Sequence, residues 1–494
     1  MKDTLHRALA AAPAKALAFD DGSRRLNYGE LRSVVASECS WLRMRDLQRC
    51  GLLAENGCGW AIADLALLRL RAPNLPLPTF FTPSQMIHAV DDAGMDHVLT
   101  DRATEFCAAH RQFTLVAVSP YSGLALLQRT GRVPSRELPK DVAKITYTSG
   151  STGAPKGVAL SAGSLLAVAE SLAAAVRTAG VQRHLCLLPL STLLENLTAI
   201  YVPLLLGATS LLPPSSRTGV RYGQFDPREL ISTVATSQAH SVVLVPELLR
   251  ALIAGSNASE GFPSLRFVAV GGAAVSQSLL AAADALGLPV FEGYGLSECA
   301  SVVCLNTHGA RRPGSVGRPL PHVRLRVDEV GEIHVAGAVM SGYIGDDELT
   351  RSDSKSREIA TGDIGEIDAD GYVYVRGRRR NRFITSFGRN ITPEWVESEL
   401  LSEPQLKLAM VVGEAQPFAA ALLWPRADVH DEHEIAAAVA RANARLPDYA
   451  QVRRWACAPD SPAELHQLLT SNGRLRREVV LTRYARQLDS LFAP

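Results

Sequence analysis

The stretch Ile145-Thr-Tyr-Thr-Ser-Gly-Ser-Thr-Gly-Ala-Pro-Lys-Gly-Val-Ala-Leu-Ser161 is the most informative part of this chain. Residues 145–147 are predicted to end a buried strand, and a loop of glycine and hydroxyl residues then leads to Lys156: Thr148, Ser149, Gly150, Ser151, Thr152 and Gly153. Glycines let backbone N–H groups approach an anion closely, hydroxyls add donors, and the lysine adds a positive charge. The stretch therefore predicts a phosphate-binding loop, with a flexible surface loop as the alternative. It is not a Walker A loop, because Pro155 precedes the lysine and Gly157 follows it.

The bulk composition is that of an ordinary globular protein. At 494 residues the chain exceeds the size of one hydrophobic core, so two or more domains are expected. A 47% hydrophobic and 20% charged composition with a formal net charge of +1 gives no electrostatic footprint for a nucleic acid. The eight cysteines are scattered without a Cys-x-x-Cys pair, which indicates reduced cysteines in a cytoplasmic protein.

The sequence predicts no transmembrane segment. Residues 1–19 lack the apolar core of a signal peptide. The most hydrophobic region, 185–213, is interrupted by Glu195, Asn196 and Pro203. A buried core segment explains that region better than a membrane span.

The order of predicted elements indicates an α/β fold with layered sheets. Apolar helices alternate with short strands over 51–100, and helices are predicted over 164–178 and 195–206 around an apolar run at 185–189. Residues 242–245 and 267–270 are predicted strands that each follow a helix, a pattern typical of parallel α/β layers. The second of these strands ends in Gly271-Gly272, the kind of strand end where ligands bind in such sheets.

From residue 323 the pattern changes to a small β-rich subdomain. Short strands separated by Gly and Asp turns are predicted over 324–327, 331–335, 365–368 and 372–375. Beyond the basic run 376–382, the remaining residues are predicted to form a compact α+β module. The predicted domains are therefore a large N-terminal domain, 1–379, and a small C-terminal domain, 381–494, with the boundary near Arg380.

Motifs along nearly the whole chain resemble those of the adenylate-forming superfamily, which includes acyl- and aryl-CoA synthetases, peptide-synthetase adenylation domains and luciferases. The loop at 148–157 is similar to that family's phosphate loop, and Tyr294-Gly-Leu-Ser-Glu298 to its Tyr-Gly-x-Thr-Glu motif. The resemblance implies ATP and Mg²⁺ as reactants, with Lys156 beside the phosphates and Glu298 as the metal ligand and a catalytic residue. It also implies a nucleotide site formed by Gly271, Gly272, Ala273, Tyr294, Gly295 and Ser297. Read alone, the Tyr-Gly-Leu-Ser-Glu segment is equally a helix N-cap.

Two further segments resemble the family's ribose-binding motif. The resemblance implies that Asp363 of Thr361-Gly-Asp363 accepts both ribose hydroxyls and that Arg378 of Gly377-Arg378 lies beside it. A carboxylate suits that task because its two oxygens can accept from two vicinal hydroxyls. The alternative is a plain β-turn at 362–365 and a solvated charge run at 376–382.

The C-terminal part resembles the family's mobile C-terminal domain. Residues 387–397 are similar to a loop that lines the pantetheine channel in relatives with a thioester-forming step, so Gly388 is assigned to cofactor binding. Arg380 occupies the position of the family's hinge residue, where aspartate or lysine is common.

One departure from the family concerns its C-terminal lysine. Ser471-Asn-Gly-Arg-Leu-Arg-Arg477 resembles the motif Ser-Gly-Lys-x-x-Arg, and Arg474 occupies the lysine position. Arginine keeps the charge but presents a planar fork, so the exchange is not conservative. Either Arg474 serves as the catalytic cation or adenylation has been weakened or lost.

The resemblance to fatty acyl-CoA synthetases implies an ATP-dependent ligase of lipid metabolism. It would convert a small-molecule carboxylic acid, fatty or otherwise apolar, to acyl-AMP and transfer it to the thiol of CoA or of a carrier protein's phosphopantetheine. Residues 188–195 resemble the Leu-Pro-x-x-His-x-x-Glu element, with Thr192 in place of histidine. Residues 188–194 contain no carboxylate to pair with an ammonium, which disfavours amino acids. Aryl acids stay open, as does a homologue that only binds nucleotide or performs only the thioester step.

Overall fold

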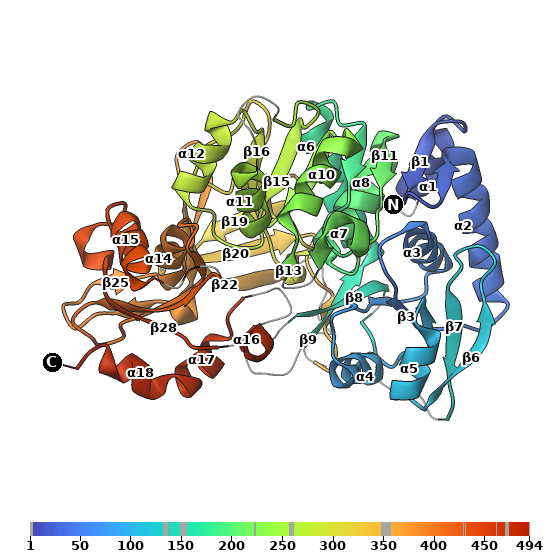
Figure 1. The fold of residues 1–494 in the computed structure, drawn as a ribbon. Coiled ribbons are helices and arrows are strands. Elements are labelled where there is room, and N and C mark those ends of the chain that lie inside the picture. The colour runs from blue at the N-terminus through green and yellow to red at the C-terminus, as the bar shows by residue number, and fades with distance from the viewer. Residues whose placement is uncertain are drawn as a thin grey trace.

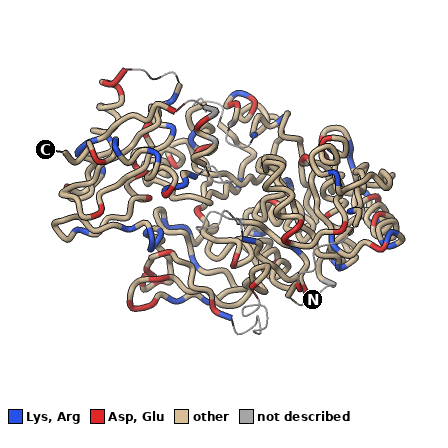
Figure 2. The backbone as a smooth tube through the Cα atoms, turned by 90° about the horizontal axis from the view of Figure 1, so that it is seen from below, with Lys and Arg blue, Asp and Glu red and all other residues tan. Residues whose placement is uncertain are grey.

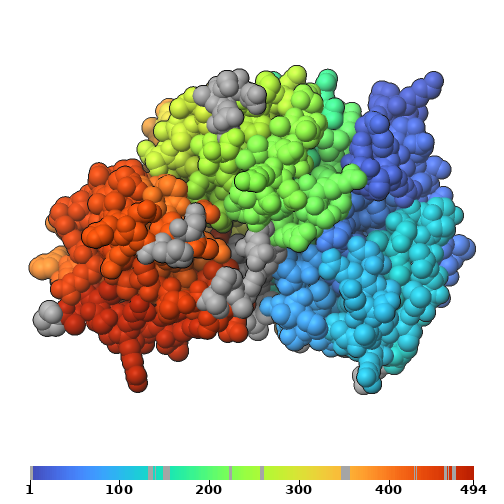
Figure 3. Space-filling model, in the orientation of Figure 1, coloured from blue at the N-terminus to red at the C-terminus, as the bar shows by residue number. Residues whose placement is uncertain are grey.

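The computed structural model describes residues 3–131, 137–139, 141–148, 156–221, 224–255, 261–346, 357–427, 429, 431–460, 462–469 and 474–493. In Figure 1 a large body of sheets and helices carries a smaller C-terminal part at one end. The space-filling view in Figure 3 shows that C-terminal part as a lobe of its own, at the opposite end from the first helix.

The strands on either side of the predicted phosphate-binding loop belong to a mixed sheet with the order β21-β9-β8-β4-β3-β5-β7-β6. Strands β3, β4, β5 and β8 are parallel, whereas β6, β7, β9 and β21 pair antiparallel with their neighbours. The strands are β3 (Cys50–Leu53), β4 (Asn74–Pro76), β5 (His97–Thr100), β6 (Phe113–Val118), β7 (Ala125–Arg129), β8 (Val142–Thr148), β9 (Lys156–Ser161) and β21 (Gly342–Tyr343).

A second sheet has the order β18-β17-β16-β15-β14-β10-β11-β1-β2, and its central strands from β16 to β1 are all parallel. Its strands are β1 (Leu17–Asp20), β2 (Arg25–Asn27), β10 (Arg183–Leu185), β11 (Thr209–Leu211), β14 (Ser241–Leu244), β15 (Phe267–Val270), β16 (Val290–Tyr294), β17 (Cys304–Leu305) and β18 (Arg318–Pro319). A separate short hairpin pairs β12 (Val220–Arg221) with β13 (Gln224–Phe225).

Helices connect and cover these two sheets, and local sequence explains where several begin. Asn27 and Glu30 form a capping box at α2, and the Ser161 and Asp226 side chains accept backbone N–H groups at the starts of α6 and α10. The helices are α1 (Asp3–Ala11), α2 (Tyr28–Arg43), α3 (Cys58–Leu70), α4 (Pro83–Asp92), α5 (Ala103–Ala109), α6 (Ala162–Arg177), α7 (Leu193–Asn196), the π-helical η1 (Leu197–Tyr201), α8 (Val202–Leu206), α9 (Ser215–Thr218), α10 (Pro227–Ser237), α11 (Pro246–Ala254), α12 (Gln277–Ala285) and the 3₁₀ turn η2 (Ser297–Cys299).

The predicted β-rich subdomain is an antiparallel sheet of β19 (Val323–Val327), β20 (Glu332–Gly337), β22 (Glu358–Ile367) and β23 (Val373–Arg378). Strand β22 is longer than predicted and alternates exposed with buried residues along its first half. The segment Thr361-Gly-Asp363 lies inside this strand, so the alternative of a plain β-turn is wrong.

The C-terminal part mixes strands and helices around its own buried clusters. It contains the 3₁₀ turns η3 (Arg379–Asn381) and η4 (Asp448–Ala450), a hairpin of β24 (Phe383–Ile384) and β25 (Asn390–Ile391), and a sheet of β26 (Leu406–Val412), β27 (Ala419–Pro425) and β28 (Val452–Cys457). Its helices are α14 (Pro393–Leu400), α15 (Glu432–Asn443), α16 (Pro462–Leu468), α17 (Arg477–Arg483) and α18 (Ala485–Ser490). The α/β fold class, with a large N-terminal part and a small C-terminal one, is confirmed.

The charges agree with the near-neutral composition. Figure 2 shows basic and acidic residues interspersed along the whole chain. Among the described residues, no helix combines the length and apolar character needed to cross a membrane.

Candidate active site

The predicted phosphate-binding loop joins two antiparallel strands. Thr148 of β8 and Lys156 of β9 are the last pair in the register of these two strands. The loop therefore begins and ends at the same end of the two strands. Ser149, Gly150, Ser151, Thr152 and Gly153 lie outside the described residues, and their phosphate contacts stay a prediction. Because a strand follows the loop and α6 begins only at Ala162, positive charge at the loop's end comes from exposed Lys156 rather than from a helix dipole.

Strand β8 is held in place by a buried ion pair that sequence reasoning missed. Lys144 is 1% exposed, and its Nζ lies 2.6 Å from Oδ1 of Asp64 on α3. The other oxygen, Oδ2, accepts from Asn196 Nδ2 and Tyr201 Oη at 3.0 Å each. The network therefore ties the strand that leads into the loop to α3 and to both ends of the π-helical turn η1.

Gly157 serves packing as well as the loop. A Cβ at this position would lie 2.7 Å from Cγ1 of Ile344 and 3.0 Å from the ring of Tyr147, closer than real contacts allow. A glycine is required here because β9 passes tightly between two buried side chains. Its place in the motif thus has a structural cause independent of an anion.

Lys156 and Glu298 are brought together by Tyr343, which sequence reasoning did not single out. The Lys156 Nζ lies 5.5 Å from the centre of the Tyr343 ring, a cation–π distance. The Tyr343 hydroxyl donates to Glu298 Oε1 at 3.0 Å. Burial, followed by the Glu298 carboxylate, raises the pKa of Tyr343, so the hydroxyl keeps the proton that it donates. No local pattern predicts this contact, because it depends on the pairing of β21 with β9.

A second group joins Tyr294, Asp363 and Arg378. Asp363 on β22 and Arg378 on β23 form a direct cross-strand pair, and Arg378 Nε lies 2.9 Å from Asp363 Oδ1. The Tyr294 hydroxyl, at the end of β16, donates to Asp363 Oδ2 at 2.6 Å. Burial raises the pKa of Asp363, and the charge of Arg378, the Tyr294 hydrogen bond and the charge of Arg474 oppose that rise. The predicted ribose ligand is thus a buried carboxylate whose two oxygens are both oriented.

The glycines of the predicted nucleotide site lie where the ends of β15 and β16 meet. A Cβ at Gly271 would lie 2.9 Å from the carbonyl oxygen of Gly293, and Gly272 has a φ of +81°. A Cβ at Gly295 would lie 1.6 Å from the carbonyl oxygen of Ser301, so only glycine fits there. Gly272 and Ala273 are exposed, and Ser297 and Glu298 are half-buried in η2.

Arg474 reaches this second group from the C-terminal part. It is an exposed residue that interacts electrostatically with Arg378, Asp363 and Glu394. The structure therefore brings the residue that replaces the family's lysine to the predicted nucleotide site. Glu394 was missed by sequence reasoning, since it occupies a variable position of the 387–397 loop motif.

The predicted hinge and thioester loop are exposed. Arg380 lies on the surface in η3, and Gly388, with a φ of +72°, forms the tip of the β24–β25 hairpin beside Phe387, which is 75% exposed. No described contact joins Gly388 to either group above. Its assignment to cofactor binding stays a prediction.

The segment that resembles the acyl-binding element is mostly buried. Thr192 precedes α7, and Glu195 is fully buried, with Oε1 accepting from the Leu187 N–H at 2.9 Å. Leu193 and Leu197 belong to the main hydrophobic core. Burial in that core accounts for the apolar residues without an acyl chain.

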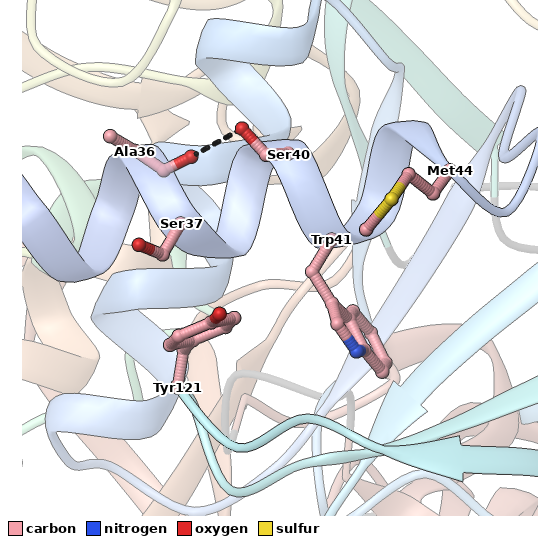
Figure 4. A pocket seen from close by; sticks show the side chains of 6 residues that line it. All are labelled: Ala36, Ser37, Ser40, Trp41, Met44 and Tyr121. Carbon is pink, nitrogen blue, oxygen red and sulfur yellow. Dashed lines mark hydrogen bonds between the residues drawn. The ribbon is translucent and has the colours of Figure 1, made fainter.

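A surface hollow lies away from these groups, between α2 and the β6–β7 turn. Figure 4 shows its lining residues: Ala36, Ser37, Ser40, Trp41, Met44 and Tyr121. Ser37, Ser40 and Tyr121 contribute hydroxyls, of which that of Ser40 already donates to the Ala36 carbonyl at 3.0 Å. No residue of the predicted nucleotide site lines this hollow.

Comparisons with known proteins identify the family of the chain. The family model "AMP-binding enzyme" matches residues 5–344, and "AMP-binding enzyme C-terminal domain" matches residues 380–494. The chain is 26% identical to the long-chain-fatty-acid–CoA ligase FadD15 of Mycobacterium bovis, over 88% of this chain and 86% of that protein. It is 28% identical to the 2-succinylbenzoate–CoA ligase of Bacillus cytotoxicus, over 81% and 82% respectively.

Solved structures share the fold over almost the whole chain. The anthranilate CoA ligase AuaEII, in complex with anthranoyl-AMP, superposes with a TM-score of 0.80 at 20% identity, covering 99% of this chain and 97% of that one. The O-succinylbenzoate coenzyme A synthetase of Bacillus subtilis, in complex with ATP and magnesium, gives a TM-score of 0.74 at 22% identity, covering 96% and 98%. The chain belongs to the AMP-binding enzyme family, within the adenylate-forming superfamily that its motifs resemble.

Proposed function

We propose that the chain is an AMP-forming acid–thiol ligase. In the first half-reaction a carboxylate oxygen attacks the α-phosphorus of ATP, and the bond to pyrophosphate breaks to give acyl-AMP. In the second, a thiolate sulfur attacks the acyl carbon and AMP leaves. The observation that carries the proposal is the convergence of Tyr294, Asp363 and Arg378 with Arg474 from the C-terminal part.

The proposed nucleotide site assigns a task to each charged group. Asp363 would accept the ribose hydroxyls, because each carboxylate oxygen keeps a lone pair beyond the bond it already accepts. Lys156, at the end of the loop, would stabilise charge on the phosphates. Arg474 would supply a second cation to the reacting carboxylate and α-phosphate.

Glu298 is suited to bind Mg²⁺. Mg²⁺ takes one or two carboxylates and completes its shell with water and phosphate oxygens. Tyr343 fixes one oxygen of Glu298 by donating to it. When bound, Mg²⁺ would neutralise charge on the phosphates, and Glu298, oriented by Tyr343, would be its protein ligand.

We infer an apolar acid, alkyl or aryl, as the substrate and CoA as the acceptor. The relatives above are named as ligases of both acid classes and of CoA. An amino acid is disfavoured because residues 188–194 contain no carboxylate. Glu195, the next residue in the sequence, is fully buried, and its Oε1 accepts from the Leu187 N–H.

The proposal is tested by ligation itself. The chain would be incubated with ATP, Mg²⁺ and a panel of fatty and aryl acids, with CoA or a phosphopantetheinylated carrier protein as acceptor, and thioester and AMP would be measured. Equimolar acyl-CoA and AMP are expected for one acid class. Thioester on the carrier protein alone would overturn the choice of acceptor, and AMP release without any thioester would overturn ligation.

The rival function is nucleotide binding without adenylation, motivated by Arg474. The placement of Arg474 beside Asp363 and Arg378 supports catalysis over this rival. Tight ATP binding with no AMP formed from any acid would favour the rival.

A further inference from the structure

Glu394 lies where the C-terminal part meets the last strand of the β-rich subdomain. It is the second residue of α14, and its Oε1 accepts a hydrogen bond from Asn381, next to the predicted hinge residue. Helix α14 (Pro393–Leu400) contacts β23. Gly377, near the end of β23, makes room for two side chains: a Cβ there would lie 2.1 Å from Thr392 Cγ2 and 2.9 Å from Glu394 Oε2.

The second oxygen of Glu394 is buried and has no hydrogen-bond partner among the described residues. Leaving a buried carboxylate oxygen unsatisfied is costly, so stability alone does not explain a glutamate here. This oxygen is shielded from solvent and lies against Gly377, the residue before Arg378 of the predicted nucleotide site.

The charges around Glu394 form a balanced cluster. Arg378 forms a 2.9 Å ion pair with Asp363. Arg474 interacts electrostatically with Arg378, Asp363 and Glu394. Two guanidinium groups thus face two carboxylates. Without Glu394, the Arg474 cation would face Arg378 with Asp363 as the single counter-charge of this cluster.

We propose that Glu394 is a positioning residue that orients Arg474 for adenylation and ties the C-terminal part to the hinge in this arrangement. Arginine presents a planar fork whose donors point in fixed directions, whereas the lysine that it replaces is a point charge, so the guanidinium acts only when a counter-charge holds it in the right direction. The proposal rests on the proposed function, since it assigns Glu394 to the first half-reaction and not to the second.

The test separates the two half-reactions. Glu394→Gln keeps the size of the side chain and an acceptor for Asn381 but removes the charge. Acid-dependent ATP–pyrophosphate exchange is expected to fall about tenfold or more, because misplacing a reacting group by a small distance is costly. Thioester formation from supplied acyl-adenylate and CoA should stay within about twofold of wild type. Exchange within twofold of wild type, or an equal loss in both half-reactions, would overturn the proposal.

Two matched variants control for loss of an ion pair. Glu366→Gln breaks an exposed pair with Arg376 on the same subdomain and should leave both half-reactions unchanged. Glu247→Gln breaks the 3.9 Å pair with Arg426, a second contact between the large N-terminal part and the C-terminal part. Glu247→Gln should leave exchange within about twofold of wild type. If it instead lowers exchange as much as Glu394→Gln does, loss of contact between the two parts would explain both results, and the orienting role of Glu394 would be overturned.

A readout independent of activity is trypsin cleavage after the exposed hinge residue Arg380. Cleavage should be severalfold faster in Glu394→Gln than in wild type and Glu366→Gln, because proteolysis reports how often the hinge region opens. Equal rates would overturn the tie to the hinge. The cleavage rates test the role of Glu394 at the hinge even if wild type shows no ATP–pyrophosphate exchange with any acid. That second outcome would contradict only the proposed function.

Discussion

Replacing Glu292 by glutamine is expected to remove a pH-dependent loss of stability. Glu292 lies on β16, two residues before Tyr294, and is 7% exposed. Its Oε2 accepts the Gly314 N–H at 2.9 Å. Burial raises the pKa of Glu292 from 4.5 to about 8, although the Gly314 hydrogen bond and the charge of Arg311 oppose the rise. Glutamine keeps an acceptor for Gly314 and removes the titrating group.

The sign and size follow from proton linkage. Between pH 4.5 and about 8 the folded chain holds a proton on Glu292 that the unfolded chain has released, so the free energy of unfolding falls as pH rises. At roughly 1.4 kcal/mol for each pH unit, the raised pKa of this glutamate amounts to about 5 kcal/mol across that window. Glu292→Gln should therefore gain stability over wild type progressively, from about 1 kcal/mol near pH 5 to about 4 kcal/mol near pH 8.

The assay is denaturant unfolding of wild type and Glu292→Gln at several pH values from 5 to 8. All other groups titrate alike in both proteins, so the difference between the two curves isolates Glu292. The exposed Glu366→Gln variant serves as the control and should run parallel to wild type. A constant difference between Glu292→Gln and wild type from pH 5 to 8 would refute the reasoning.

Three further substitutions test the groups around the site. Asp64→Ala leaves Lys144 buried without its counter-ion and should lower the free energy of unfolding by about 3–5 kcal/mol, measured by denaturant titration; a change below 1 kcal/mol would contradict the buried pair. Tyr343→Phe keeps the ring beside the loop but removes the bond to Glu298, so the Mg²⁺ concentration for half-maximal exchange should rise about tenfold, and an unchanged Mg²⁺ titration would argue against the metal assignment. Arg474→Ala should slow exchange by about 10²–10³-fold, with Arg474→Lys within about tenfold of wild type; a large gain in Arg474→Lys would mean that arginine is a poor substitute.

Local patterns predicted much of the fold. Residues 267–270 are predicted as a strand and form β15. A short apolar run that ends at two glycines is typical of a buried strand. The helix predicted over 164–178 is α6, which begins at Ala162 because Ser161 caps it. The α/β class follows from such alternating elements.

Long-range contacts set the limits of that prediction. The long helix expected over 195–206 contains the π-helical turn η1, which follows Asn196 and ends at Tyr201. Both of these residues donate to Asp64, and no local pattern reveals that partner. Thr361-Gly-Asp363 has the residues of a turn, yet pairing with β20 and β23 extends β22 through it. Tertiary pairing overrides local propensity at both places.

The candidate site shows the same division. The resemblance predicted Asp363 and Arg378 as neighbouring site residues, and their adjacency follows from one hairpin of the β-rich subdomain. Tyr343 and Glu394 were not predicted, because their roles depend on contacts with residues distant in the sequence. Such positions are recognised only when the strands are paired in space.

The central claim, that the chain adenylates an apolar acid, is tested most directly by acid-dependent ATP–pyrophosphate exchange. Wild type and Lys156→Ala would be compared across fatty, aryl and amino acids. Exchange with one apolar class, lost about 10²-fold or more in Lys156→Ala, is the predicted result. Silence across the panel while ATP still binds, or exchange that survives Lys156→Ala unchanged, would contradict the account.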